Sequence, residues 1–179
     1  MTEITYNEAE KLLKKHIKDE INIFNHSRTV SNFLYKTCLK IKKLHPELNI
    51  NPEKMRIIGL LHDIGRDKLR KDIFHANAGA KILEKEGLKN YANIIKTHAI
   101  AKEVAEIKDI KEDFEPKTLE QELLTYADAH VKHGEVVSFE KRFNDVLERN
   151  KNNPERYEAL KKGFKRIEKI IRKIDKLLA

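Results

Sequence analysis

Two side chains that commonly bind metals, His62 and Asp63, stand next to each other in an apolar stretch of the sequence. Leu60 and Leu61 precede them and Ile64 follows. Burying an ionisable side chain is costly unless a partner or a metal compensates it, so something should hold an adjacent His and Asp in such a stretch. The pair therefore predicts a metal site, and capping of backbone groups is the alternative use of the same two side chains.

Four further residues of metal-ligand type fall at the start or on the apolar face of other predicted helical segments. They are His26, His75, His98 and Asp128. Taken singly, each histidine can also be a packed core residue, and Asp128 can be a buried carboxylate that caps a backbone group. Taken together with His62 and Asp63, however, all six are metal-ligand types, which independent accidents of packing would rarely select.

The donor types narrow the choice of metal. Imidazole and carboxylate ligands together suit manganese, iron, cobalt, nickel and zinc. One metal would leave some of the six residues unused, whereas two metals that share a carboxylate would use them all. The single cysteine, Cys38, excludes an internal disulfide and a cysteine-rich metal site. We therefore expect two divalent metals per chain.

The elements that must position these residues are predicted to be helices. The 179 residues include only 6 Gly and 4 Pro, and helix formers dominate. Thr5 and Thr118 each begin a sequence with the spacing of a capping box. Asn51 and Asn153 are each followed by a Pro and a Glu, which is typical of a helix start. Apolar spacing predicts further helices over 26–44, 75–86 and 90–104, with a break at 22–25 and a charged loop over 105–117.

We expect an all-α fold, a helical bundle that forms a single domain over residues 1–179. The net charge of +8 favours anionic partners such as a small phosphorylated molecule or a nucleotide, and a generic basic surface would account for it equally well. Because acidic and basic residues are interleaved, nucleic acid is the less favoured partner. No apolar run reaches the length of about 20 residues that a membrane span needs, and the N-terminus lacks the features of a signal peptide, so a cytoplasmic location is expected. The apolar stripe of the helix that starts at Asn153 packs across the bundle or forms the seam of a homodimer.

The order of the six residues resembles the HD-domain superfamily of metal-dependent phosphohydrolases. Four local strings carry the resemblance: the residues from His26 to Val30, from Gly59 to Arg66, from His75 to Ala80 and from Tyr126 to Ala129. The similarity covers residues 26 to about 133, and residues 1–25 and 134–179 are expected to be flanking helices. Two positions depart from the common pattern: Arg66 stands where many relatives have Lys, and Ala99 stands where some have a second His. The second departure lowers the expectation of a cyclic dinucleotide substrate.

The resemblance implies a role for each residue. His26, His62, Asp63 and Asp128 would bind one metal, and His75 and His98 would bind the second. Asp63 would be the carboxylate that bridges them.

The implied activity is hydrolysis of a phosphate ester or anhydride, with a mononucleotide or a dinucleoside polyphosphate as the expected substrate. Asp63 would position the attacking hydroxide, and Arg66 would offset charge on the phosphoryl oxygens. The residue that gives a proton to the leaving group is not assigned, and the candidates are Lys68, His130 and His133. Two alternatives remain: a mixed-valent di-iron oxygenase on the same fold, and a non-catalytic module that binds nucleotides or RNA.

Overall fold

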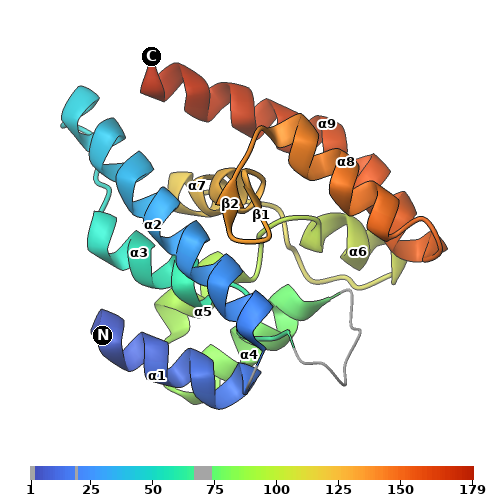
Figure 1. Cartoon of the computed structure of the whole chain (residues 1–179), viewed down its shortest axis with the longest axis horizontal. Helices are drawn as coiled ribbons and strands as arrows, with labels where there is room; N and C mark the ends of the chain where they lie inside the picture. The colour runs from blue at the N-terminus through green and yellow to red at the C-terminus, as the bar shows by residue number, and fades with distance from the viewer. Residues whose placement is uncertain (1–2, 19, 67–73) are drawn as a thin grey trace.

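The computed structural model describes residues 3–18, 20–66 and 74–179, and nearly all of the regular secondary structure in the described part of the chain is helical. Figure 1 shows the helices packed as a bundle, with the N-terminal helices on one side and the last two on the other. The helices are α1 (Tyr6–Ile17), α2 (Ile21–Leu44), α3 (Pro52–Leu61), α4 (His75–Lys85), α5 (Lys89–Ile95), α6 (Ala101–Ile107), α7 (Leu119–Asp128), α8 (Phe139–Arg149) and α9 (Pro154–Leu178), and a short hairpin of β1 (Val131–Lys132) and β2 (Glu135–Val136) precedes α8. The expected all-α class is confirmed.

The predicted helix starts are observed because their caps form. The hydroxyls of Thr5 and Thr118 accept hydrogen bonds from the third backbone N–H of α1 and α7, and both capping boxes are complete. The side chains of Asn51 and Asn153 do the same for α3 and α9, each followed by Pro at the first helical position. These local bonds satisfy N–H groups that a helix start otherwise leaves without partners.

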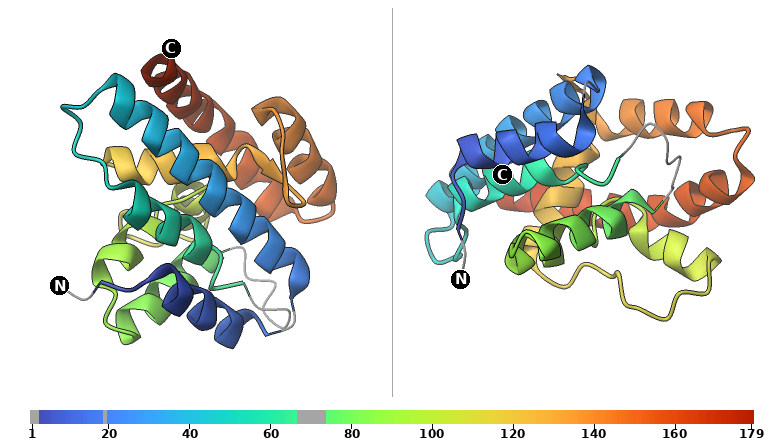
Figure 2. Two further views of the ribbon diagram at one scale, coloured as in Figure 1. Left: turned by 60° about the vertical axis from the view of Figure 1, so that its left-hand side comes forward. Right: turned by 90° about the horizontal axis from the view of Figure 1, so that it is seen from below.

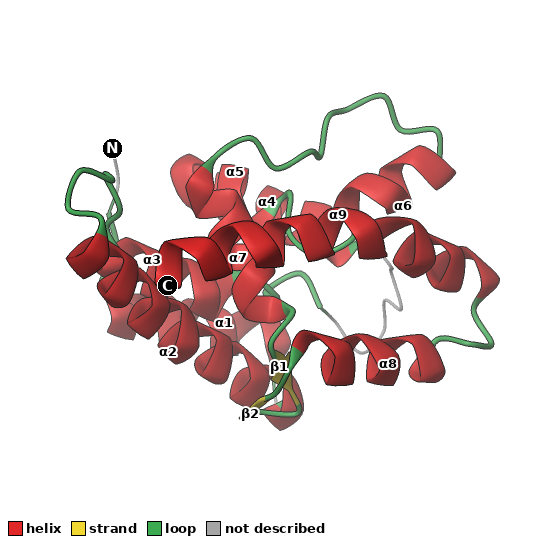
Figure 3. Cartoon of the chain, turned by 90° about the horizontal axis from the view of Figure 1, so that it is seen from above, coloured by secondary structure: helices red, strands yellow, loops and turns green. Residues whose placement is uncertain are grey.

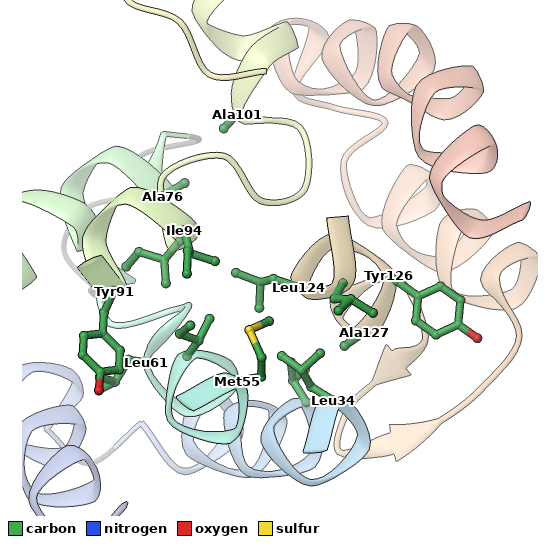
Figure 4. Packing of buried hydrophobic residues seen from close by; sticks show 14 of the residues in the cluster. Leu34, Met55, Leu61, Ala76, Tyr91, Ile94, Ala101, Leu124, Tyr126 and Ala127 are labelled. Atoms are coloured by element: carbon green, nitrogen blue, oxygen red, sulfur yellow. The ribbon is translucent and has the colours of Figure 1, made fainter. Parts of the chain in front are cut away.

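The core is organised around the contact between α2 and α3, the most extensive one between described elements. Gly59 of α3 lies against the backbone of α2, and a Cβ added there would lie only 2.8 Å from Cα of Ser31. Figure 4 shows Met55 of α3 gathered with Leu34 of α2 and Leu124 of α7, and all three are fully buried. The close approach of α2 and α3 sets the distance between the histidines that these two helices carry.

Three boundaries differ from the predictions. The break expected at 22–25 is absent, and α2 already begins at Ile21. The reason is that Ile23 and Phe24 pack against the core, which outweighs the weak helix propensity of the exposed asparagines beside them. The helix expected over 90–104 is interrupted between α5 and α6, where Ala99 has a φ of 54°. The helix α6 runs to Ile107, so the charged loop begins later than expected.

The segment after α7 turns the chain into a helical hairpin of α8 and α9. Gly134, with a φ of 85°, makes the tight turn between β1 and β2. Phe139 and Phe143 of α8 pack against Phe164 of α9 with ring centroids 5.4 and 4.6 Å apart. Figure 2 and Figure 3 show α8 and α9 extending from the same end of the bundle. Among the described residues, none of the helices is long and apolar enough to cross a membrane.

Candidate metal centre

The six predicted ligands come together at one buried position in the bundle. His26 lies in α2, His62 and Asp63 follow α3, His75 begins α4, His98 lies in the turn between α5 and α6, and Asp128 ends α7. Their exposed fractions run from 0% for His62 to 9% for His26. The fold thus brings together residues that the sequence spreads over about a hundred positions, and their role as metal ligands stays a prediction.

The rings of His62 and His98 are held with Nε2 facing the centre. Nδ1 of His62 lies 2.7 Å from the backbone carbonyl oxygen of Gly59, and Nδ1 of His98 lies 2.5 Å from that of Ile95. A carbonyl oxygen only accepts, so each Nδ1 carries a proton and donates it. Each neutral ring then has a lone pair on Nε2, and Nε2 of His62 is buried with no hydrogen-bond partner in the described part of the chain. Histidines that bind metals are commonly oriented in this way.

The two oxygens of Asp63 face different histidine pairs. Oδ1 lies 3.2 Å from Nε2 of His75 and 3.7 Å from Nε2 of His98. Oδ2 lies 3.5 Å from Nε2 of His62 and 3.8 Å from Nε2 of His26. The carboxylate of Asp63 thus presents one oxygen to each of the two histidine pairs.

The remaining donor atoms lie close to these two histidine pairs. Oδ1 of Asp128 lies 3.0 Å from Nε2 of His26 and 3.8 Å from Nε2 of His62, while Nε2 of His75 and of His98 are 3.2 Å apart. Two sets of three donor atoms each lie within 4.8 Å of one another: those of His26, His62 and Asp128, and those of His62, Asp63 and His98. The donors and their convergence therefore fit a divalent metal.

The protonation states of four of these residues also fit, whereas at His98 the effect of burial is outweighed by contacts with Asp63 and Asp128, which raise the pKa of His98. Burial is the main cause that lowers the pKa of His62 to about 4 and that of His75 to about 3. Burial alone would raise the pKa of both carboxyl groups, but Arg66 beside Asp63 and His26 beside Asp128 hold each carboxyl pKa well below its usual range. Neutral imidazole and ionised carboxylate are the forms that bind metals.

Arg66, the residue predicted to contact substrate, stands at the edge of this centre. Its Nε lies 2.7 Å from Oδ2 of Asp63, and its Nη2 lies 3.4 Å from Nε2 of His75. The side chain is 33% exposed, so it links the buried ligands to the space outside them. A guanidinium in this position can pair with Asp63 or with an incoming anion.

Close backbone packing positions His75. Gly65 follows the His62–Asp63 pair, and a Cβ at this position would overlap the backbone carbonyl oxygen of His75 and the backbone nitrogen of Gly79. Only glycine allows the turn after α3 to lie this close to the start of α4. His75 is thereby held beside Asp63.

A buried ion pair positions the turn that carries His98. The guanidinium of Arg166 in α9 lies 2.7 and 2.8 Å from the two carboxylate oxygens of Glu103, which is 3% exposed. Nη2 of Arg166 also donates to the carbonyl oxygen of Ala99 at 2.7 Å. This bond holds the interrupted region between α5 and α6 in place, and sequence periodicity gives no sign of it.

A cavity of about 520 Å³ opens beside the centre. Its lining includes His26, Asp63 and Arg66 of the centre, and Arg142, Arg149 and Arg156 of α8 and α9. A smaller space of about 70 Å³ shares Arg142 and Arg156 and is lined by apolar side chains that include Phe139 and Phe143.

Sequence reasoning did not identify the three arginines of α8 and α9. Arg142 and Arg149 lie in α8 and Arg156 lies in α9, and charged residues on such helices are typical of a solvated face. Only the fold shows that these arginines of two helices line one cavity beside the centre.

The candidates for the leaving-group proton donor are placed differently. His133 lines the cavity and is largely exposed. His130 uses Nδ1 to contact the carbonyl oxygen of Tyr126 at 2.8 Å and packs against the Tyr126 ring. Lys68 lies outside the described residues. The identity of this donor stays open.

Comparison with known proteins agrees with the geometry. Residues 23–133, more than half of the chain, match the HD domain family. An uncharacterized protein of Methanocaldococcus jannaschii is 35% identical over 141 residues, which cover 74% of this chain and 80% of that protein. No solved structure matches the chain. HD domains bind divalent metals, and the matched residues include all six predicted ligands. The chain therefore belongs to the HD domain family, the superfamily of metal-dependent phosphohydrolases.

Proposed function

We propose that this protein is a phosphohydrolase that cleaves a phosphate ester or anhydride of a nucleotide-type substrate and uses two divalent metals. One observation carries the proposal: the two oxygens of Asp63 are divided between the pair His26 and His62 and the pair His75 and His98. A carboxylate with a purely structural role needs only one of these histidine pairs beside it. A carboxylate that bridges two metals needs one histidine pair beside each of its oxygens.

Metals held by these residues would lower the pKa of a water molecule toward neutrality and offset charge on the phosphoryl oxygens. Asp63 is ionised and buried, so it can accept a hydrogen bond from the attacking water and hold it in line with the leaving group. Arg66 can donate two parallel hydrogen bonds to phosphoryl oxygens at the cavity edge. Burial of the ligands strengthens these interactions, because the surroundings contain little water.

A small phosphorylated substrate suits the space beside the centre. The cavity of about 520 Å³ falls in the size range of small-molecule sites, and guanidinium groups line it. Its apolar extension, lined by Phe139 and Phe143, offers a surface for a base or another flat group. These features favour a nucleotide over a long nucleic acid.

The test combines metal analysis with an activity panel. Protein purified without chelator is analysed for metal, and phosphate release is measured from a panel of nucleotides with manganese, cobalt, nickel or iron. We expect about two metals per chain and release from one class of nucleotide. Asp63→Asn keeps the size of the side chain but removes its charge, and it should reduce turnover by at least about a hundredfold, since such electrostatic contributions are typically worth that much.

His16→Ala serves as the control, because His16 lies on α1 near Glu86, away from the six ligands. This variant should keep both metal and activity. Full turnover in Asp63→Asn would contradict the proposal. Bound iron with oxygen consumption and no phosphate release would favour the oxygenase, and RNA binding with a steep salt dependence in a metal-free protein would favour the binding module.

A further inference from the structure

The cavity beside the metal centre contains more positive charge than its surroundings neutralise. Arg66 and the three arginines of α8 and α9 bring four guanidinium groups to its lining. Three of the four, Arg142, Arg149 and Arg156, lie after residue 133 and so outside the part of the chain that matches the family. The three arginines lie in the C-terminal helices α8 and α9; Figure 3 shows α8 at one end of the bundle and α9 running from that end across it.

The carboxylates near these arginines have other partners. Asp145 lies 2.8 Å from Nη2 of Arg149 and 3.8 Å from Nη1 of Arg142. Arg142 also lies 3.8 Å from Asp128, and Arg66 pairs with Asp63, but both of these aspartates are predicted metal ligands. If both aspartates bind metal, Asp145 is the one carboxylate of the described residues that remains paired with Arg142 and Arg149.

Arg156 has the least compensation. Its side-chain Nε is buried, and in the described part of the chain it has no hydrogen-bond partner. Burial, followed by the nearby charge of Arg66, lowers the pKa of the Arg156 guanidinium to about 10. Arg142 and Arg149 line the same cavity as Arg156 and share Asp145 as a carboxylate partner. Such a group of cations costs free energy unless an anion binds among them.

We infer that Arg142, Arg149 and Arg156 bind a second phosphate of the substrate, one that is not cleaved, so that the enzyme selects substrates with at least two phosphate groups. The inference rests on the proposed function, since the centre acts on the other phosphate. In that step a water oxygen bonds to phosphorus, the bond from phosphorus to the leaving oxygen breaks, and the leaving oxygen takes a proton. The second phosphate is unchanged and fixes the substrate's position.

Arginine suits this task better than lysine does. Its planar guanidinium donates paired hydrogen bonds that match phosphate oxygens, and it keeps its charge when buried. Arg142 is 13% exposed and Arg149 is 48% exposed, so the set runs from the inside of the cavity to its mouth. A substrate with a single phosphate at the metal centre would leave these groups without an anion.

The first experiment measures binding alone, on the full chain. Inorganic tripolyphosphate and orthophosphate are titrated into metal-free protein by calorimetry, so that competition for divalent metal plays no part. We expect one tripolyphosphate per chain, bound at least about tenfold more tightly than orthophosphate. Arg156→Gln should weaken tripolyphosphate binding by about tenfold or more, as loss of one charge-assisted contact predicts, and Arg149→Gln should weaken it as well.

Two variants serve as controls. Arg172→Gln removes a charge of the same kind from α9, where Arg172 is 72% exposed and pairs with Glu168, and it should change binding by less than about twofold. Arg156→Lys keeps the charge but loses the paired donors, and it should bind with intermediate affinity. Equal loss in Arg172→Gln and Arg156→Gln, or unchanged binding in both Arg156→Gln and Arg149→Gln, would overturn the inference.

Turnover separates this inference from the proposed function. With metal added, Arg156→Gln should raise KM for a nucleoside diphosphate or triphosphate and leave KM for the corresponding monophosphate unchanged. A protein that hydrolyses nothing but binds tripolyphosphate through Arg156 would refute the proposed function and keep the anion site. A protein that hydrolyses nucleotides, with equal KM effects of Arg156→Gln on monophosphates and triphosphates, would keep the function and refute the site.

Discussion

At the scale of single residues, the chemistry depends on which atoms face the centre. His62 and His98 donate from Nδ1 to backbone carbonyl oxygens of their own helical turns, so Nε2 of each ring faces the centre. Arg66 supplies a cation beside Asp63 in the structure described above. These contacts pre-arrange the ligands.

The Arg66 contact leads to a stability prediction. Arg66→Gln removes the cation beside a buried carboxylate, so the metal-free protein should lose about 1–3 kcal/mol of unfolding free energy, with a partly exposed pair expected toward the lower end. Metal supplies the missing positive charge, so the metal-loaded variant should lose less. Urea unfolding with chelator and with manganese measures both values. An equal loss under the two conditions would show that Arg66 does not serve as the counter-ion of Asp63.

At the scale of elements, much of the site could be predicted from sequence. Apolar spacing placed each of the six residues at a helix end or on a buried face, because a helix that buries one face also fixes which polar residues lie on it. Capping residues such as Thr5 and Asn51 marked helix starts, because those bonds are local. The interruption at Ala99 could not be predicted, because Arg166, which holds it, is distant in the sequence.

The packing of α4 against the turn after α3 gives a second prediction. Gly65→Ala would force backbone atoms apart, and overpacking of this kind costs about 1–3 kcal/mol. His75 would move away from Asp63, so we expect fewer bound metals as well as a lower unfolding free energy. Metal analysis and urea unfolding test both effects.

Gly163→Ala is the control for that experiment. Gly163 lies within α9, and the atoms nearest an added Cβ are side-chain atoms, starting with Cγ2 of Ile100 at 3.0 Å. Side chains can adjust, and Ala favours a helix interior over Gly, so this change should lower the unfolding free energy less than Gly65→Ala does. Because Glu103 is also close to the added Cβ, Gly163→Ala is a control for stability and not for metal content. Full metal content in Gly65→Ala would mean that this glycine does not position His75.

At the scale of the whole molecule, the C-terminal helices, which follow the region that matches the family, contribute side chains around the centre. Arg142, Arg149 and Arg156 line the cavity, and Arg166 holds the turn that carries His98. The sequence did not show this, because basic residues on amphipathic helices are more often solvated than functional. The expectation that residues 1–179 form a single domain stays a prediction.

Arg166 gives the prediction at this scale. Arg166→Met leaves Glu103 buried without its cation, and breaking such a pair typically costs about 3–5 kcal/mol. The turn at Ala99 also loses its donor, so His98 should bind metal less well. Adding Glu103→Leu should recover stability without restoring metal, because the Ala99 contact is still missing. Recovery of full metal content in the double variant would assign Arg166 to stability alone.

The bond from Arg166 to Ala99 also has a consequence for the order of events during synthesis. The two residues are separated by 67 positions, so His98 and the five other predicted ligands are all synthesised before Arg166. The half of the centre that contains His98 can therefore reach its final form only after translation has passed α9. A metal bound through His98 would therefore be held in its final arrangement only once α9, which also contributes Arg156 to the cavity, has packed onto the bundle.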